Sequence, residues 1–208
     1  MFGKDYFERI FKKGTPWGLS TLSYERVKYE RQIEMMRRFA PSAQSILEIG
    51  CAEGDYTTMM AKAYPDAIIN ALDISHIAVE KAKKSCQTYG NILVMEGDII
   101  ELLKGQQHFS PESLDIVIQS ECLYYLFPKL VTSLYLYEYF RNMTGIMKKG
   151  GIFLTANSMR GAIRCVMPLY HTILRRFLKP VYNGKFREWN QYRNEFLTYE
   201  LRVFRRTG

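Results

Sequence analysis

The strongest constraint on the fold is the stretch ILEIGCAEG at residues 46–54. It begins as a short apolar strand that ends in a carboxylate, and it continues through a turn that holds Gly50 and Gly54. A strand that passes through a glycine turn into a helix is typical of a doubly wound α/β domain, which binds a cofactor at the carboxyl ends of its strands. Glycine lets the backbone come close to such a ligand. The stretch therefore predicts a nucleotide-like cofactor site next to Glu48.

Length and composition are those of one domain of moderate size. The chain has 208 residues, of which 47% are hydrophobic and 24% are charged. It contains no apolar run near the roughly 20 residues of a membrane helix and no signal-peptide pattern, so we expect a cytoplasmic protein without stable membrane insertion. Its four cysteines are widely scattered, which predicts free thiols and no metal site.

The net charge of +8 is unevenly distributed. Residues 1–157 carry equal numbers of basic and acidic side chains, and the whole excess comes from residues 158–208. A basic segment can attract an anionic partner such as nucleic acid, but it is also typical of a solvated surface. We favour the solvated surface, so the expected partner is a small-molecule acceptor, and nucleic acid is an alternative that we do not favour.

Strands alternate with helices along most of the chain, which predicts βαβ crossovers and a parallel sheet. We expect helices at 24–39, 56–63, 75–85 and 128–146, and one or two amphipathic helices within 158–180, broken by Pro168. The expected strands are 45–49, 68–72, 91–96, 114–119, 152–156, 186–192 and 199–205, with a turn at 148–151 and a hairpin connection around Asn194. The fold class is therefore α/β: a Rossmann-like, doubly wound sheet of seven strands, mainly parallel with an antiparallel C-terminal hairpin strand, and with helices on both faces.

No repeat, low-complexity segment or linker interrupts the chain, so residues 1–208 are predicted to form a single domain. Residues 1–40 are expected to be an N-terminal helical lid, 41–157 the cofactor-binding core, and 158–208 the substrate-side helices and closing strands. Trp17 and Tyr24 lie in the lid segment, where they would cover the cofactor. Aromatic residues at such spacing also occur as ordinary packing, and both interpretations stay open.

The glycine spacing and the carboxylate indicate which kind of cofactor binds. A dinucleotide motif needs its first two glycines one residue apart, whereas three residues separate Gly50 from Gly54. Glu48 would repel a phosphate, but it suits a cationic amino-acid group such as the methionine end of S-adenosylmethionine. Asp73 ends the next strand, where an acid can accept hydrogen bonds from both ribose hydroxyls, although it could also serve as a helix cap.

Two further strand ends carry acids. Asp98 follows the third strand, where it could accept a hydrogen bond from an adenine amino group while Ile99 covers a ring face; taken alone, Asp98 fits a loop or cap role better. Ser120 and Glu121 end the fourth strand. Because the carboxyl ends of parallel strands meet at one crevice, we expect four carboxylates to converge there, those of Glu48, Asp73, Asp98 and Glu121.

Together these motifs resemble those of class I S-adenosylmethionine-dependent methyltransferases over about residues 45–156. The resemblance rests on EIGCAEG at 48–54, DIS at 73–75, GDI at 97–99, DIV at 115–117 and GGIFL at 150–154. It implies S-adenosyl-L-methionine as the cofactor and S-adenosyl-L-homocysteine as its product. It places Glu48 and Gly50 near the methionine portion, Asp73 on the ribose, and Asp98 with Ile99 at the adenine. The other cofactor-binding residues expected around this crevice are Cys51, Ala52, Gly54, Tyr56, Ile74 and Ser120.

A narrower resemblance is to the nodulation-protein S (NodS-like) family of N-methyltransferases. It rests on PW at 16–17, SYER at 23–26, KY at 28–29, SECLYYL at 120–126 and YELRVF at 199–204. Members of that family N-methylate an amino sugar on a chito-oligosaccharide, so the resemblance implies N-methylation of an amino sugar or of a natural-product amine. The aromatic and basic segment 158–198 departs from the family pattern.

Methyl transfer requires an acceptor that is positioned in a dry, electrostatically suitable site. A neutral amine already has a nucleophilic lone pair, whereas a hydroxyl usually needs a base. We assign the catalytic role to Glu121, which would accept a hydrogen bond or a proton from the acceptor nitrogen, with Tyr124 and Tyr125 as walls that orient the acceptor. Alternatively, Glu121 only orients the cofactor or caps a turn.

Three other functions stay open. A small-molecule O-methyltransferase could use His171 as its base, an RNA methyltransferase could use the basic segment 158–208, and a regulatory protein could bind S-adenosylmethionine without catalysis. The acids at four strand ends argue against the regulatory protein. The chain has no NPPY or DPPY run for methylation of the adenine amino group, no Pro-Cys nucleophile for cytosine C5, and no clustered Asp/Asp/Asn set for a magnesium-dependent enzyme.

Overall fold

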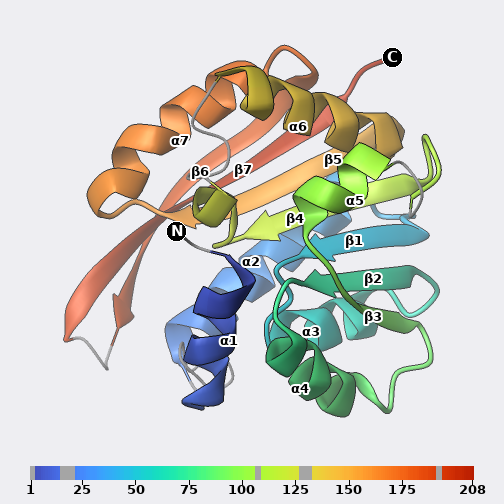
Figure 1. Cartoon of the computed structure of the whole chain (residues 1–208). Helices are drawn as coiled ribbons and strands as arrows, with labels where there is room; N and C mark the ends of the chain where they lie inside the picture. The colour runs from blue at the N-terminus through green and yellow to red at the C-terminus, as the bar shows by residue number, and fades with distance from the viewer. Residues whose placement is uncertain (1–2, 15–21, 106–108, 127–132, 191–193) are drawn as a thin grey trace.

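Seven strands form one sheet, and helices cover both of its faces (Figure 1). The computed structural model describes residues 3–14, 22–105, 109–126, 133–190 and 194–208. The helices are α1 (Lys4–Lys12), α2 (Ser23–Phe39), α3 (Asp55–Ala63), α4 (His76–Cys86), α5 (Ile99–Gly105), the short 3-10 helix η1 (Leu123–Leu126), α6 (Ser133–Ile146) and α7 (Gly161–Leu174). The strands are β1 (Ser45–Ile49), β2 (Ile68–Asp73), β3 (Ile92–Glu96), β4 (Leu114–Ser120), β5 (Met147–Ser158), β6 (Leu178–Asn190) and β7 (Glu195–Arg206).

The strand order across the sheet is β3-β2-β1-β4-β5-β7-β6. Neighbouring strands from β3 to β5 run parallel, and β7 runs antiparallel to both β5 and β6. This confirms the predicted fold class, a mainly parallel Rossmann-like sheet of seven strands with an antiparallel C-terminal hairpin. The chain proceeds from β1 to β2 and β3 on one side and returns to the other side for β4. The carboxyl ends of β1 and β4 therefore border the crevice in which such folds bind ligands.

Successive residues of the central strands point to opposite faces of the sheet, and both faces are apolar. In β5, Ile152 and Leu154 pack on the side of α2 and α3, whereas Phe153 packs on the side of α6 and α7. Strands that are buried on both faces need helices above and below, which βαβ crossovers provide. The two helical layers thus fix the strands, and with them the side chains at the strand ends.

Helix α1 covers the carboxyl ends of the strands and packs beside α4 (Figure 1). The carboxylate of Glu8 accepts hydrogen bonds from the backbone N–H groups of His76 and Ile77 at 2.6 and 3.4 Å, in the first turn of α4 where N–H groups lack partners within the helix. Lys81 of α4 donates to the carbonyl oxygens of Phe11 and Gly14 at 3.3 and 2.6 Å. These contacts attach the N-terminal segment to α4, next to the carboxyl ends of the strands.

Two predicted breaks in secondary structure are absent. Residues 148–151, expected to form a turn, belong to β5, whose pairing with β4 shifts register between Leu114 and Ile116. Between these paired positions β5 has three more residues than β4, an irregularity at which Gly150 has a φ of +80°, and the strand continues beyond it. Helix α7 runs through Pro168 without a break, because Met167, Tyr170 and Leu174 on either side of the proline are buried on one face and anchor the helix to the sheet.

Strands β6 and β7 are longer than the sequence patterns predict. Lys185 and Arg187 are exposed and alternate with the half-buried Phe186 and Glu188, so that β6 shows no apolar run. The predicted start of a helix at Pro128 and the predicted end of a strand at Tyr192 lie outside the described residues. Of the helices that the structure describes, none is long and apolar enough to span a membrane.

Candidate active site

A cavity of about 330 Å³ lies at the carboxyl ends of β1, β2 and β4, next to the start of β7. Helices α1 and α2 contribute to its walls through Phe7, Phe11 and Tyr24. The carboxylates expected to converge do so, since Glu48, Asp73, Asp98 and Glu121 all line it. Most other residues proposed from the sequence also line the cavity: Tyr24, Gly50, Cys51, Ala52, Tyr56, Ile74, Ile99, Ser120, Tyr124 and Tyr125.

Two proposed cofactor residues are exceptions. Trp17 lies outside the described residues. Gly54 is not among the residues that line the cavity. A Cβ at Gly54 would stand 3.0 Å from Sγ of Cys86 and 3.3 Å from Ala82, both on α4. Gly54 therefore permits close packing of the turn against α4, and its φ of +85° starts α3 in a left-handed conformation that glycine adopts freely.

The glycine turn is held by the neighbouring strand. The backbone N–H groups of Gly50 and Cys51 both donate to the carbonyl oxygen of Leu72, at 2.7 and 3.0 Å. Gly50 has a φ of +82°, and a Cβ there would stand 2.9 Å from Cβ of Cys122. Glycine is thus required at position 50 by both backbone conformation and space, and the turn presents its backbone to the cavity.

Glu48 is a buried carboxyl at the end of β1. It is 4% exposed and accepts a hydrogen bond from the hydroxyl of Thr57 at 2.5 Å. Burial raises the pKa of Glu48 from 4.5 to about 7, and the Thr57 hydrogen bond only partly opposes this. Among the described residues no basic side chain forms an ion pair with Glu48. A buried carboxylate without a basic partner is suited to binding a cationic ligand.

Asp73 is a second buried acid and supports the glycine turn. Its Oδ2 accepts a hydrogen bond from the backbone N–H of Ala52, and its Oδ1 accepts one from that of Ser75, both at 2.9 Å. Burial nevertheless raises the pKa of Asp73 to about 6. Ser75 in turn caps α4 by accepting from the N–H of Ala78 at 3.2 Å. Asp73 therefore positions the turn, and as a residue that lines the cavity it can accept further hydrogen bonds through its oxygens.

These raised pKa values predict how the stability of the ligand-free protein depends on pH. In the unfolded chain Glu48 titrates near 4.5, and in the folded protein near 7. Because the folded state holds the proton more tightly, stability falls as pH rises through this range, by about 3 kcal/mol for this group. We expect Glu48→Gln to gain about this much stability relative to the parent between pH 5 and pH 8, measured by urea unfolding. The exposed Glu101→Gln is the matched control, and a pH-independent difference for Glu48→Gln would contradict the account.

Asp98 has a backbone role as well as a place in the cavity wall. Its Oδ1 accepts a hydrogen bond from the N–H of Ile100 at 3.0 Å, in the first turn of α5. Oδ1 of Asp98 therefore caps α5, which is the alternative role that the sequence left open. Ile99 is buried next to Asp98 in the chain and also lines the cavity. The adjacent Gly97 is tight against α5, since a Cβ there would stand 2.8 Å from Cδ1 of Leu102. Helix α5 was not predicted, and its cap fixes the orientation of Asp98.

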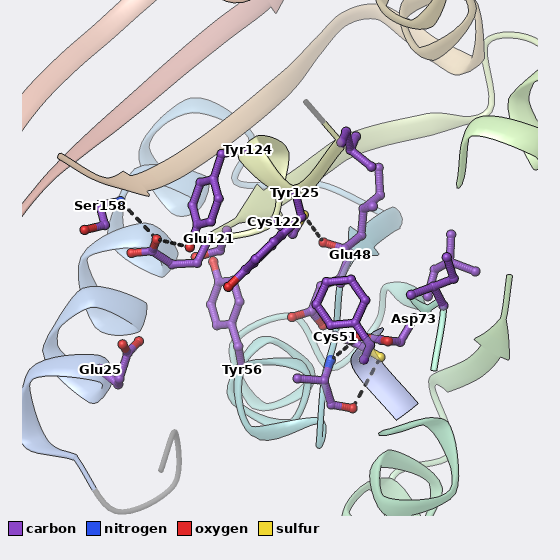
Figure 2. Close-up of a pocket in the computed structure, with 18 of the residues that line it drawn as sticks. Glu25, Glu48, Cys51, Tyr56, Asp73, Glu121, Cys122, Tyr124, Tyr125 and Ser158 are labelled. Carbon is purple, nitrogen blue, oxygen red and sulfur yellow. Dashed lines mark hydrogen bonds between the residues drawn. The ribbon is translucent and has the colours of Figure 1, made fainter. Parts of the chain in front are cut away.

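Glu121 is the centre of a hydrogen-bonded network at the end of β4. Its Oε2 accepts from the hydroxyl of Tyr124 at 3.1 Å and from the backbone N–H of Ser158 at 3.0 Å, and its Oε1 lies 3.0 Å from Nζ of Lys28. Figure 2 shows Glu121 between Tyr124 and Ser158, with Glu25 on α2. The backbone φ of Glu121 is +55°, a left-handed conformation that is uncommon outside glycine.

Lys28 and Glu25 belong to this network but were not identified from the sequence. Lys28 is 1% exposed, and its Nζ lies 2.7 Å from Oε2 of Glu25. Gln32, one turn further along α2, is also buried and donates to Oγ of Ser120 at 3.2 Å. The spacing of these three polar residues places them on one face of α2, the face that packs on the sheet. That spacing is the signal that could have found them.

Aromatic rings form much of the remaining wall. Tyr124 and Tyr125 of η1 lie side by side with ring centroids 4.6 Å apart, and Phe7 of α1 meets Tyr125 edge to face at 5.2 Å. Tyr29 and Tyr56 stack at 4.6 Å. Burial raises the pKa of Tyr124 far above its ordinary value, so Tyr124 remains a neutral hydrogen-bond donor to Glu121. The wall is apolar in its rings and polar only at directed hydroxyl groups.

The lid prediction can now be made specific to α1. Helix α2 is part of the core layer, whereas α1 contributes Phe7 and Phe11 to the cavity and is attached mainly through Glu8 and Lys81. We expect deletion of residues 1–14 to leave a folded protein with S-adenosylmethionine affinity lowered about tenfold, a change of about 1.4 kcal/mol, because the apolar contacts of Phe7 and Phe11 with the ligand would be lost. Calorimetric titration measures the affinity. Unchanged affinity in a folded truncated protein would remove the lid role.

His171 is not placed to act as a base for O-methylation. It lies in α7 with its ring centroid 5.9 Å from that of Phe204, and it is not among the cavity-lining residues. Burial lowers the pKa of His171 to about 4. Its place in the packing of α7 on β7 accounts for its presence.

Comparison with known proteins agrees with this site. A family model for nodulation protein S (NodS) matches residues 3–167. Nodulation protein S of Bradyrhizobium diazoefficiens is 30% identical over 119 residues, which cover 57% of this chain and 53% of that protein. The malonyl-[acyl-carrier protein] O-methyltransferase of Halalkalibacterium halodurans is 27% identical over 127 residues, which cover 59% of this chain and 46% of that protein. The chain thus spans about half the length of these curated relatives.

Solved structures show the same fold. The N-methyltransferase NodS from Bradyrhizobium japonicum WM9, crystallised in complex with S-adenosyl-l-homocysteine, superposes with a TM-score of 0.77 at 22% identity. The superposition covers 99% of this chain and 98% of that one. The family model covers most of the chain, including the glycine turn and all four strand-end acids. The chain therefore belongs to the nodulation protein S (NodS) family.

Proposed function

We propose that this protein is an S-adenosylmethionine-dependent methyltransferase that methylates an amine on a small molecule, such as an amino sugar or another natural-product amine. The observation that carries the proposal is the meeting of four strand-end carboxylates in one cavity, two of them buried with raised pKa values. Membership of the NodS family and the fold shared with an N-methyltransferase that binds S-adenosyl-l-homocysteine support it.

The residues present fit the cofactor. S-adenosylmethionine carries a sulfonium, an ammonium and two ribose hydroxyls, and the buried carboxylates of Glu48 and Asp73 offer acceptors for such groups. We assign Glu48 and the backbone of Gly50 to the methionine portion, Asp73 to the ribose, and Asp98 with Ile99 to the adenine. A cation beside Glu48 would offset the cost of its burial, which in the free protein holds its pKa near 7.

The charge of the cavity favours an amine over an anionic acceptor. Among the described lining residues the acids are Glu25, Glu48, Asp73, Asp98 and Glu121, and the bases are Lys28 and Arg160. The two bases are already paired, Lys28 with Glu25 and Glu121, and Arg160 with Glu195 at 2.6 Å. A negative cavity attracts a cationic amine and repels phosphates, which argues against RNA as the acceptor.

The protein's own residues position the acceptor. When bound, S-adenosylmethionine supplies a methyl group from its sulfonium and leaves as a neutral thioether. Glu121 accepts a hydrogen bond from the acceptor nitrogen and takes the proton that the nitrogen gives up, while Tyr124 and Tyr125 orient the acceptor. Helix α1 and the aromatic wall exclude water, which strengthens the electrostatic contacts inside.

A transfer assay tests the proposal. The protein is incubated with S-adenosylmethionine that carries a labelled methyl group and with a panel of amino sugars, phenols and RNA. We expect label in the amino sugars, at rates above those for the phenols, and none in RNA. Transfer to phenols alone would indicate an O-methyltransferase, and transfer to RNA would contradict the charge argument. Binding of the cofactor without transfer to any acceptor would favour a regulatory protein.

A further inference from the structure

The network around Glu121 contains a buried ammonium that the proposed chemistry does not use. Lys28 lies between two carboxylates, 2.7 Å from Glu25 and 3.0 Å from Glu121, with 2% of its side chain exposed. Its Nζ also lies 5.9 Å from the ring centroids of both Tyr24 and Tyr29. A lysine with so little exposure is rare unless it is paired, because burial of an unpaired charge is costly.

The charge on Lys28 is permanent. Burial by itself lowers the pKa of Lys28, but the carboxylates of Glu121 and Glu25 outweigh burial and raise the pKa above its ordinary value. The side chain of Lys28 therefore stays an ammonium at neutral pH, where it lies between Glu25 and Glu121. In the described residues, the titratable groups around Lys28 and Glu121 come from four places in the chain. They are Tyr24, Glu25 and Tyr29 on α2, Glu121 itself after β4, Tyr124 on η1 and Tyr199 on β7.

Both the backbone and the side chain of Glu121 are held by hydrogen bonds. A left-handed conformation costs a non-glycine residue about 1 kcal/mol and persists only where its surroundings enforce it. The backbone N–H of Glu121 donates to the carbonyl oxygen of Ala156 at 2.7 Å. Three groups hold its side chain: the ammonium of Lys28 on α2, the hydroxyl of Tyr124 on η1, and the N–H of Ser158 at the end of β5. Of these three, only Lys28 carries a charge.

We infer that Lys28 is a positioning residue for methyl transfer, which holds the Glu121 carboxylate turned toward the acceptor. The inference rests on the proposed function, because it requires an acceptor amine beside Glu121. Lys28 donates to Oε1 while Tyr124 and Ser158 donate to Oε2, so that the carboxylate plane is fixed from two sides. Lys28 acts through Glu121 and makes no contact with the acceptor in this account. A simple structural role would leave the chemistry of Glu121 unaffected.

A double-mutant cycle on kcat separates these roles. Lys28→Met keeps most of the length of the side chain and its apolar stem, and it removes the charge. This single change is expected to lower kcat about thirtyfold. The affinity for S-adenosylmethionine is expected to change less than about threefold. In a Glu121→Gln background the same change is expected to cost less than about threefold, because Lys28 then has no carboxylate to position. Lys83→Met is the matched control, since Lys83 also pairs with a glutamate three residues earlier but on the exposed face of α4.

The pH dependence of kcat provides a second test of the positioning role. Without Lys28, the carboxylates of Glu25 and Glu121 face each other with no cation between them, and like charges disfavour joint ionisation. The acidic limb of the profile is therefore expected to move to higher pH by about one unit in Lys28→Met, and not in Lys83→Met. If Lys28→Met does not fold, the double variant Glu25→Gln/Lys28→Met replaces it, because it leaves only the carboxylate of Glu121 at this place. The double variant is expected to show the same loss of kcat.

The outcomes are distinct. Full additivity of Lys28→Met and Glu121→Gln, or an unmoved acidic limb, overturns the inference and leaves the proposed function standing. A parent protein that transfers no methyl group to any amine overturns both. Loss of kcat that depends on Glu121, with cofactor affinity retained, supports the positioning role.

Discussion

Replacement of Glu121 by glutamine is expected to lower kcat for methyl transfer to an amine about a hundredfold, the contribution typical of a positioned proton acceptor. Glutamine has nearly the same shape and can still accept hydrogen bonds through its amide oxygen. It cannot take a proton from the acceptor. In one orientation its NH₂ group faces the N–H of Ser158 and the hydroxyl of Tyr124, and in the other it faces the ammonium of Lys28, all of which donate to the carboxylate of Glu121. Initial rates at saturating acceptor measure the effect, because they report the chemical step and not acceptor binding.

The affinity for S-adenosylmethionine separates this role from the alternative that Glu121 orients the cofactor. We expect Glu121→Gln to bind the cofactor as the parent does, within about threefold by calorimetric titration. Glu112→Gln is the matched control and is expected to keep full activity, because Glu112 is exposed, precedes the amino end of β4 and does not line the cavity. Parent-like kcat in Glu121→Gln would remove its catalytic role, and a joint loss of affinity and kcat would assign it to the cofactor.

Replacement of Asp73 by asparagine is expected to weaken S-adenosylmethionine binding roughly a hundredfold, since charge-assisted hydrogen bonds are worth about 1.5–3 kcal/mol each. Asparagine removes the charge that strengthens acceptance from the ribose hydroxyls. Its NH₂ group also meets the N–H of either Ala52 or Ser75, where the carboxylate accepts from both. The turn that presents Gly50 would then lose one of its supports.

The Asp73→Asn experiment requires a check of the fold. Asp66→Asn is the matched control, because Asp66 is exposed in the turn that precedes β2. Both variants are measured by calorimetric titration with S-adenosylmethionine and S-adenosylhomocysteine, and by thermal unfolding. Parent-like affinity in a folded Asp73→Asn protein would contradict the assignment of Asp73 to the ribose.

The sequence predicted the carboxylates of the site because their positions follow from strand periodicity alone. Glu48, Asp73 and Glu121 each end or follow an apolar run, and the carboxyl ends of parallel strands meet at one edge whatever the loops do. The residues around the glycine turn follow for the same reason. Their individual hydrogen bonds do not, because the role of Asp73 in holding the N–H of Ala52 depends on the path of a neighbouring loop.

The residues that sequence patterns missed come from elements whose partners are distant in the chain. The sequence around Lys28 is typical of a solvated helix face, and its role becomes visible only when α2 lies against the end of β4, where Lys28 pairs with Glu121. Phe7 and Phe11 lie in α1, whose attachment depends on the cap that Glu8 gives to α4. The full length of β6 cannot be predicted from an apolar pattern, because charged residues occupy alternate positions. An edge strand such as β6 needs few apolar side chains.

The central claim, that the cavity methylates an amine, is tested most directly with a matched pair of acceptors. D-Glucosamine and N-acetyl-D-glucosamine share the same ring and hydroxyl groups, and they differ in that only glucosamine has a free amine. With labelled S-adenosylmethionine and the intact protein, we predict that label enters D-glucosamine at the amine and does not enter N-acetyl-D-glucosamine. Equal labelling of the two sugars would place the methyl group on a hydroxyl and contradict the account.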